Sequence, residues 1–197
     1  FAFANGYRET FDSRDSTPDT ALQGTMPVGE DGEWSAHMEG DFYLLENRGS
    51  PTAVRYFYVL PTNSTWSDPG DIVRVSIGGM FVGGEYHSGA GLLLGFDPAT
   101  RHYDAFVLQD NLEYAIYRRD SDGLRAVLSG TSDAIRAAGR NQIEVRFIGN
   151  TMHMFINQTE VGSLSRALGH GAGIGVIALG AGLFEFDDFE LPNAILG

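Results

Sequence analysis

Cysteine is absent from the 197 residues of this chain. Disulfides, a thiol nucleophile and a thiolate metal site are therefore excluded. The absence of disulfides does not exclude an extracellular location, because a large sandwich can be stable without them. No apolar run approaches the roughly 20 residues that a membrane-spanning helix needs, so we expect no membrane insertion.

Lysine is also absent, and all 13 basic residues are arginines. We interpret this bias as the codon usage of a GC-rich genome. The 26 acidic residues give a net charge of −13. Nucleic-acid binding needs a basic face, and an anionic membrane surface repels an acidic protein. The composition therefore predicts neither a nucleic acid nor a membrane as partner.

Residues 90–191 form a series of short apolar or alternating runs, most of which end in, or are followed by, glycine, aspartate, asparagine or serine. The runs are GLLLGFD, YDAFVLQD, LEYAIYRRD, RAVLSG, NQIEVRFIG, TMHMFINQTEV, GAGIGVIAL and LFEFDDFEL. Strand-length runs at a spacing of roughly 8–12 residues are typical of an all-β sandwich or barrel. Only residues 132–138, SDAIRAA, followed by Gly139, carry the signals of a short helix. The sequence predicts an all-β antiparallel sandwich of two sheets with at most one short helix.

The N-terminal half continues this pattern. The strands expected there are 7–12, 40–46, 53–60, 72–77 and 80–82. Residues 53–60, AVRYFYVL, are apolar or aromatic on both faces, which predicts a central strand. Gly78 and Gly79 are expected to interrupt the strand that contains them, as in a β-bulge.

The whole chain is expected to be one domain, 1–197, because it has no Pro/Ser-rich linker, repeat or low-complexity tract. Residues 1–6 and 192–197 are interpreted as extended arms. Their apolar residues either fray, pack against their own domain or dock onto a neighbouring subunit by strand addition.

The C-terminal half resembles the concanavalin A-like jelly-roll domains of laminin-G type. The resemblance is nearest to the bacterial subgroup related to the 3-keto-disaccharide hydrolase domain. It rests on the ordered pieces GLLLGF, YDAFVL, IEVRF, MFIN, GIGV and FDDFEL. It implies a jelly roll whose first strand, near residues 9–12, pairs with its last. The chain departs from the pattern where Gln158 follows Asn157 in place of glycine. This fold serves lectins, adhesion modules, glycosidases and structural domains, so it does not imply one function.

The run Glu185-Phe186-Asp187-Asp188-Phe189-Glu190 is similar to the E-x-D-x-x-E motif of laminarinase-type β-glucanases. By that resemblance Glu185 is the nucleophile, Asp187 the helper and Glu190 the acid/base of a retaining mechanism. The alternative is a closing strand with a bulge at Asp187-Asp188 that returns Phe189 to the core. We favour the closing strand, because the glucanase motif lies mid-chain beside cleft tryptophans.

Sugar binding needs exposed aromatic rings that stack on pyranose faces. The candidate platforms in or beside loops are Trp34, Trp66, Tyr86 and Tyr103. Glycosylation sequons begin at Asn63 and Asn157.

No histidine spacing indicates a metal site. Asp120 and Asp122 are candidate calcium ligands, but the Asp120-x-Asp122-Gly123 loop lacks the further oxygen ligands of a calcium loop. Turn chemistry explains that loop more simply. We expect no cofactor, with calcium as the one alternative.

Taken together, these patterns favour a non-catalytic carbohydrate-binding or adhesion-type module with a polysaccharide or glycan as partner. The alternative is a self-assembling structural subunit of an extracellular filament or surface layer, which would associate through its terminal arms. A third reading is a glycoside hydrolase that uses Glu185 and Glu190. We expect an extracellular or cell-surface protein whose signal peptide has been removed, because the chain begins at Phe1 without methionine.

Overall fold

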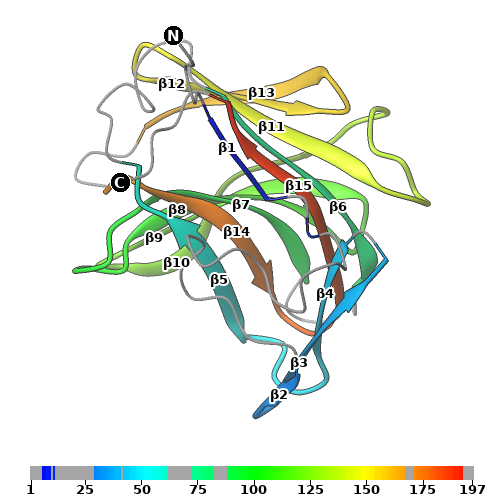
Figure 1. The fold of residues 1–197 in the computed structure, drawn as a ribbon. Helices are drawn as coiled ribbons and strands as arrows, with labels where there is room; N and C mark the ends of the chain where they lie inside the picture. The colour runs from blue at the N-terminus through cyan, green and yellow to red at the C-terminus, as the bar shows by residue number, and fades with distance from the viewer. Residues whose placement is uncertain are drawn as a thin grey trace, which may run out of the picture.

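Two antiparallel β-sheets pack face to face in this protein (Figure 1). The structure is a computed structural model that describes residues 6–9, 11, 29–40, 42–61, 72–81, 88–166 and 171–192, with the backbone alone at 79–81. The predicted all-β sandwich is confirmed. Trp66, Tyr86, Asn63 and most of both terminal arms lie outside the described residues.

The larger sheet has nine strands in the described parts of the chain, in the order β13-β12-β11-β6-β15-β4-β3-β2, with β1 paired to β15. Its strands are β1 (Tyr7–Glu9), β2 (Gly29–Asp31), β3 (Trp34–Glu39), β4 (Phe42–Asn47), β6 (Ile72–Phe81), β11 (Asn141–Ile148), β12 (Thr151–Ile156), β13 (Thr159–Ser165) and β15 (Gly182–Leu191). β1 pairs antiparallel with the end of β15, Tyr7 opposite Leu191. The expected pairing of the first and last strands is therefore confirmed, two residues earlier than predicted.

The smaller sheet has six described strands in the order β10-β9-β8-β7-β14-β5. They are β5 (Val54–Val59), β7 (Gly89–Phe96), β8 (Tyr103–Gln109), β9 (Glu113–Asp120), β10 (Gly123–Thr131) and β14 (Gly173–Leu179). β5 lies at one end of this order, so the prediction of a central strand at 53–60 is wrong. Its outer face is aromatic because Tyr56 and Tyr58 pack against the ring of Phe96, with ring centroids 4.8 and 4.6 Å away.

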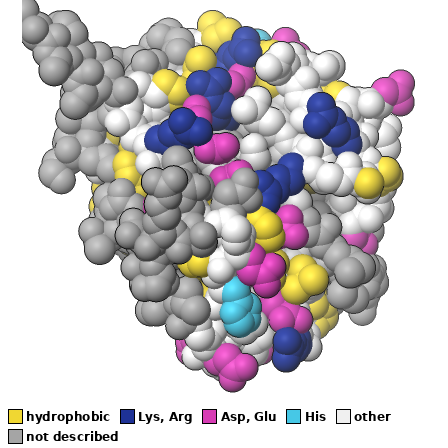
Figure 2. Space-filling model, turned by 45° about the vertical axis from the view of Figure 1, so that its right-hand side comes forward, with side chains coloured by type: hydrophobic (Ala, Val, Ile, Leu, Met, Phe, Trp, Pro, Cys, Tyr) yellow, Lys and Arg dark blue, Asp and Glu magenta, His cyan; other side chains and the backbone are white. Residues whose placement is uncertain are grey.

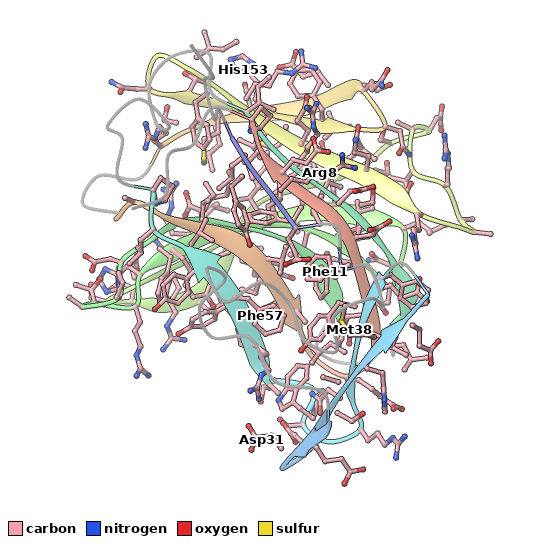
Figure 3. All side chains as sticks on the ribbon, in the orientation of Figure 1. Arg8, Phe11, Asp31, Met38, Phe57 and His153 are labelled. Carbon is pink, nitrogen blue, oxygen red and sulfur yellow. The ribbon has the colours of Figure 1, made fainter. Side chains whose placement is uncertain are left out.

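The main core lies between the two sheets, where alternate residues of most strands meet. Phe57 of β5 contacts Phe186 of β15 edge to face, with ring centroids 6.4 Å apart, and so links the two sheets. Figure 3 shows Phe11 and Phe57 in this interior. A second buried cluster, which includes Leu93, Val107 and Ile177, lies on the other face of the smaller sheet. Burial on both faces explains why β7, β8 and β14 read as nearly continuous apolar runs.

The predicted bulge in the last strand is confirmed. The register of β15 against β6 shifts between Asp187 and Glu190, and Asp188 has a φ of 48°. Phe184, Phe186 and Phe189 are all fully buried. One extra residue on β15 therefore keeps Phe189 in the core and leaves the carboxylates of the acidic run on the opposite face.

Two local predictions are wrong. Residues 132–138 form turns rather than a helix: the amide of Ile135 donates to the carbonyl of Ser132, but the next turn does not follow. β6 also runs unbroken through its two glycines, because β15 pairs along both of them. A Cβ at Gly78 would lie 2.9 Å from Glu185 Oε2, so this glycine makes room for a side chain of the neighbouring strand.

Two buried tyrosines predict instability in alkali. Burial raises the pKa of Tyr103 to about 12 and raises the pKa of Tyr43 further. An unfolded tyrosine ionises near pH 10, so above that pH the unfolded chain loses protons that the folded chain retains. The free energy of unfolding should be unaffected by these groups below about pH 10 and should then fall by about 1.4 kcal/mol per pH unit for each tyrosine. Thermal unfolding at pH 9, 10 and 11 checks this, and Tyr103→Phe should show a shallower decline than the wild type. An equal decline in both would contradict the assignment.

Candidate functional site

The outer face of the larger sheet carries the acidic run of β15. Because of the bulge, Glu185, Asp187 and Glu190 project from the same face. Glu185 lies opposite Gly78 and Glu190 opposite Arg74. These partners are four residues apart on β6, so the two glutamates are about 13 Å apart along the sheet at their backbones. The structure thus brings the three predicted catalytic candidates onto one accessible face.

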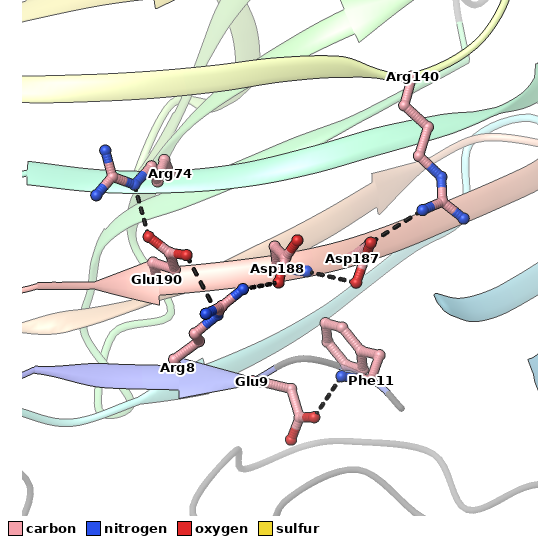
Figure 4. A network of polar contacts seen from close by, with 8 residues as sticks. All are labelled: Arg8, Glu9, Phe11, Arg74, Arg140, Asp187, Asp188 and Glu190. Carbon is pink, nitrogen blue, oxygen red and sulfur yellow. Dashed lines mark hydrogen bonds and ion pairs between the residues drawn. The ribbon is translucent and has the colours of Figure 1, made fainter. Parts of the chain in front are cut away.

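Arginines pair with all of these carboxylates. Figure 4 shows the pairs of Asp187 and Glu190. Arg140 lies 2.9 Å from Asp187 and 3.9 Å from Glu185. Arg74 lies 2.7 Å from Glu190. The pKa of the Arg74 guanidinium is raised, first by its hydrogen bond to that carboxylate. We call these residues, with Arg8, Glu144, Arg146 and Asp188, the arginine–carboxylate network. Figure 2 shows basic and acidic side chains interspersed over the face that it views.

The arginine–carboxylate network affects whether Glu185 and Glu190 could act as the catalytic pair of a glycosidase. A retaining hydrolase needs one carboxyl group that holds a proton and a second that is free to attack the sugar. In this structure Glu190 bonds Arg74, and Glu185 lies beside Arg140. A carboxylate that bonds a guanidinium is not free to attack a sugar, and backbones about 13 Å apart do not match the roughly 5–5.5 Å between the carboxyl groups of a retaining pair. The arrangement suits a rigid polar surface better than acid–base chemistry.

Next to the network, residues 132–140 cross the end of β6 as a series of turns. The side chain of Asn141 holds this segment: its Oδ1 accepts from the amide of Arg136, and its Nδ2 donates to the Arg136 carbonyl. These two bonds replace the backbone bonds of a helix at this point, which explains why the helix signal fails. They also fix the backbone from which the Arg136 side chain extends.

Asn157 supports the same segment from the neighbouring hairpin. β12 and β13 are joined by Asn157 and Gln158, with φ of 48° and 69°, the geometry of a type I′ turn. Asn157 Nδ2 donates to the Ala134 carbonyl and to Asn141 Oδ1, both at 2.8 Å. Its Oδ1 accepts from the amide of Gln142 at 2.9 Å. One side chain therefore joins the turn, β11 and the 132–140 segment.

A shallow hollow of about 420 Å³ lies between these elements, and we call it the polar hollow. It is lined by Ser76, Arg136, Arg140, Gln142, Asn157 and Gln158. The lining holds two guanidinium groups and no carboxylate, in a chain whose net charge is −13. A second hollow of about 210 Å³ is lined by residues of both sheets, such as Ile77 of β6 and Leu108 of β8, and Arg136 lines it as well. The side chains of Arg136, Gln142 and Gln158 have no polar partner within the described residues, so their hydrogen-bonding groups are available to a ligand.

Two of the predicted sugar platforms have to be corrected. Trp34 is 7% exposed and Tyr103 only 1% exposed. Trp34 lies in β3 against Phe184 of the main core, and Tyr103 lies in the second buried cluster. A buried ring cannot stack on a sugar in solvent, so neither is a platform. Trp66 and Tyr86 lie outside the described residues.

The structure also describes the glycosylation candidate Asn157 and the calcium candidates Asp120 and Asp122. Both hydrogens of Asn157 Nδ2 are donated within the fold, so attachment of a glycan would break one of these bonds. The structure therefore argues against glycosylation at this sequon.

Asp120 holds Arg125 through two bonds of 2.7 and 2.9 Å and accepts a hydrogen bond from the amide of Asp122. These bonds lower the pKa of Asp120. In the part of the chain that the structure describes, no three acidic or histidine side chains group as metal ligands. Calcium stays an untested prediction.

Sequence reasoning missed Arg136, Arg140, Gln142 and Gln158 as site residues. The one available signal was the Asn157-Gln158 pair in place of Asn-Gly, because glutamine at a positive φ is unusual and such strain gathers at functional sites. The other three residues come from separate segments, and only strand pairing brings them together.

Comparison with known proteins supports the fold assignment. No protein-family model matches the chain, and no curated protein matches it in sequence. Among solved structures, the carbohydrate-binding module CBM66 from Bacillus subtilis has a TM-score of 0.58 at 11% identity, over 80% of this chain and 90% of that one. The carbohydrate recognition domain of Emp47p has a TM-score of 0.61 at 12% identity, over 97% and 96% of the chains. A β-glucanase from Bacillus licheniformis has a TM-score of 0.61 at 10% identity, over 98% and 100%.

These findings define the class: the chain has the concanavalin A-like lectin/glucanase fold, as the sequence resemblance implied. Proteins that share this fold include sugar-binding modules and glycoside hydrolases, and identities this low show the fold alone. The described residues contain no helix that is long and apolar enough to cross a membrane.

Proposed function

We propose that this protein binds a polysaccharide at the polar hollow without cleaving it, outside the cell or at its surface. The observation that carries the proposal is an open hollow in which the side chains of Arg136, Gln142 and Gln158 have no polar partner among the described residues. The carboxylates beside it are paired with arginines. Sugar hydroxyls are recognised by amides and guanidinium groups held in fixed positions. The Asn141 and Asn157 bonds supply that fixed position here.

The proposal places the sugar on the outer face of the larger sheet. Gln142 extends from β11 and Gln158 from the β12–β13 turn, so two amides from different elements line the hollow with Arg136. The glutamine in the turn is informative because glycine would suit its backbone better. A side chain retained at a strained position is consistent with a role in binding.

Gln158→Gly tests this use of the hollow. Glycine removes the amide from the hollow and suits the positive φ of 69°. We expect binding to the preferred polysaccharide to weaken about 10-fold, the effect of about 1.4 kcal/mol of hydrogen bonding. The melting temperature should stay the same or rise, because strain is relieved. A glycan array identifies the polymer, and titration calorimetry with thermal unfolding measures both effects. If Gln158→Gly lowered the stability of the protein but left its affinity for the polysaccharide unchanged, the hollow would be excluded as the binding site.

The hydrolase alternative is tested in the same experiment. Its specific support is the placement of Glu185 and Glu190 on one face. Release of reducing ends from β-glucans by the wild type, lost in both Glu185→Gln and Glu190→Gln, would show catalysis and overturn the non-catalytic assignment. Assembly into filaments through the terminal arms stays a proposal, because residues 1–5 and 193–197 lie outside the described structure.

A further inference from the structure

We propose that the polymer bound at the polar hollow carries carboxylates, as in a polysaccharide that contains uronic acids, and that Arg136 binds the carboxylate. This inference rests on the proposed function and names the class of its ligand. A guanidinium group presents parallel N–H donors that match the two oxygens of a carboxylate. The neutral contacts of Gln142 and Gln158 would then hold hydroxyls of the same or the adjoining sugar.

Unlike most of the arginines that the structure describes, Arg136 has no ion pair with any described residue. Arginines elsewhere on the described surface hold carboxylates, for example Arg118 on Asp104, Arg125 on Asp120 and Arg140 on Asp187. Arg101 also has no ion pair among the described residues, but only Arg136 of the two lines the hollow. Arg136 is exposed, and within the described residues its side chain makes no hydrogen bond or ion pair.

The backbone of Arg136 is held although its side chain is free. Asn141 bonds both its amide, at 2.8 Å, and its carbonyl, at 3.1 Å. Less conformational entropy is lost when a ligand binds to a side chain that extends from an ordered backbone. A single accessible guanidinium suits the single charge of one carboxylate group.

The electrostatic surroundings favour an anion locally. Arg140 is the second cation of the hollow, and its own carboxylate, Asp187, lies outside the hollow lining. Asp110 lines the adjoining hollow together with Arg136. At physiological ionic strength, charges farther than about 8 Å away are largely screened. Within that range Asp187 offsets Arg140, so Arg136 is the guanidinium of the hollow that an anion can engage.

The test compares uronate polymers with their neutral counterparts. Polygalacturonate and alginate are measured beside their carboxyl-reduced forms, which retain the linkages and lose the charge. Titration calorimetry in about 0.15 M salt is applied to the wild type, to Arg136→Gln and to Arg101→Gln. Arg101 is a matched control: it is exposed, has no ion pair within the described residues and lies at the far end of β8 from the hollow.

We expect the wild type to bind a uronate polymer at least about 10-fold more tightly than its reduced form. Arg136→Gln should lose that preference and bind the reduced form as the wild type does, while Arg101→Gln should behave as the wild type. Arg136→Lys should retain part of the preference, because the charge remains and the paired donors are lost.

Several results would overturn the inference. Equal binding of acidic and reduced polymers would refute it and leave the proposed function standing. A preference that survives in Arg136→Gln, or that falls equally in Arg101→Gln, would assign it to another site or to net charge. A preference for sulfated over desulfated polymers without one for uronates would refute the carboxylate assignment. Absence of binding to every polymer would refute the proposed function and the inference together.

Discussion

Replacing Gly91 by alanine is expected to lower the free energy of unfolding by more than about 3 kcal/mol. Gly91 lies in β7, and a Cβ there would stand only 1.9 Å from the carbonyl oxygen of Phe106 on β8. Both strands are interior to the smaller sheet, flanked by β14 and β9, so neither can move outward to make room. The methyl group must therefore break part of the β7–β8 ladder. Urea unfolding followed by tryptophan fluorescence measures the loss.

Gly162→Ala is the matched control. This glycine is also in a strand, β13, but the nearest atoms to its added Cβ are the ends of the Leu128 and Met154 side chains, at 3.2 and 3.7 Å. Flexible side-chain ends can move by a few tenths of an ångström, so we expect a change within about 1 kcal/mol. If both variants lost the same stability, the close approach of β7 and β8 would not be the cause.

Asn157→Ala is expected to destabilise the protein by about 3 kcal/mol and to weaken polysaccharide binding as well. The change removes the hydrogen bonds to the Ala134 carbonyl and from the Gln142 amide. It also removes one of the two bonds that Asn141 Oδ1 accepts, the other being from the Arg136 amide. It also places alanine at a φ of 48°, where L-residues other than asparagine and glycine are disfavoured. The 132–140 segment loses one of its anchors, so Arg136 and the hollow become less ordered. Thermal unfolding and titration calorimetry measure the two effects.

Asn157→Gly separates the two causes. Glycine loses the same hydrogen bonds but accepts the positive φ, so it should be about 1 kcal/mol more stable than Asn157→Ala while binding polysaccharide equally weakly. If Asn157→Gly bound like the wild type, the asparagine side chain would have no part in ordering the hollow. Equal stability of the glycine and alanine variants would show that the turn conformation contributes nothing.

Local pattern predicted most of the fold. Alternation of apolar and polar residues, together with the turn residues, was enough to predict the strands of the C-terminal half. The reason is that the side-chain period of two is a property of each strand by itself. The bulge near Asp188 was predictable for the same reason: Phe186 and Phe189 can both reach the core only if one extra residue lies between them. The pairing of the first strand with the last came from the family resemblance.

The errors arose where a residue's neighbours lie far away in the sequence. Residues 53–60 were expected in the middle of a sheet because both faces are apolar, yet β5 is at the end of its sheet and its outer tyrosines are packed on Phe96. Trp34 and Tyr103 were expected in solvent because they adjoin turns, yet both are buried. The helix signal at 132–138 failed because Asn141 bonds the backbone of Arg136.

By itself, the sequence determined most of the strands, the two-layer architecture, the acidic surface and the face to which the last strand turns its carboxylates. These properties follow from side-chain periodicity and charge, which act over a few residues. β2 and β3 lie where no strand was predicted. The polar hollow was decided by tertiary structure alone. It joins Ser76, Gln142, Arg136 and Gln158 from four segments, and it exists because β6, β11 and the β12–β13 turn pair in one register. That same register decides which carboxylates are paired with arginines and which guanidinium groups have no carboxylate partner among the described residues. The reason is that these ion pairs join residues that are distant in sequence.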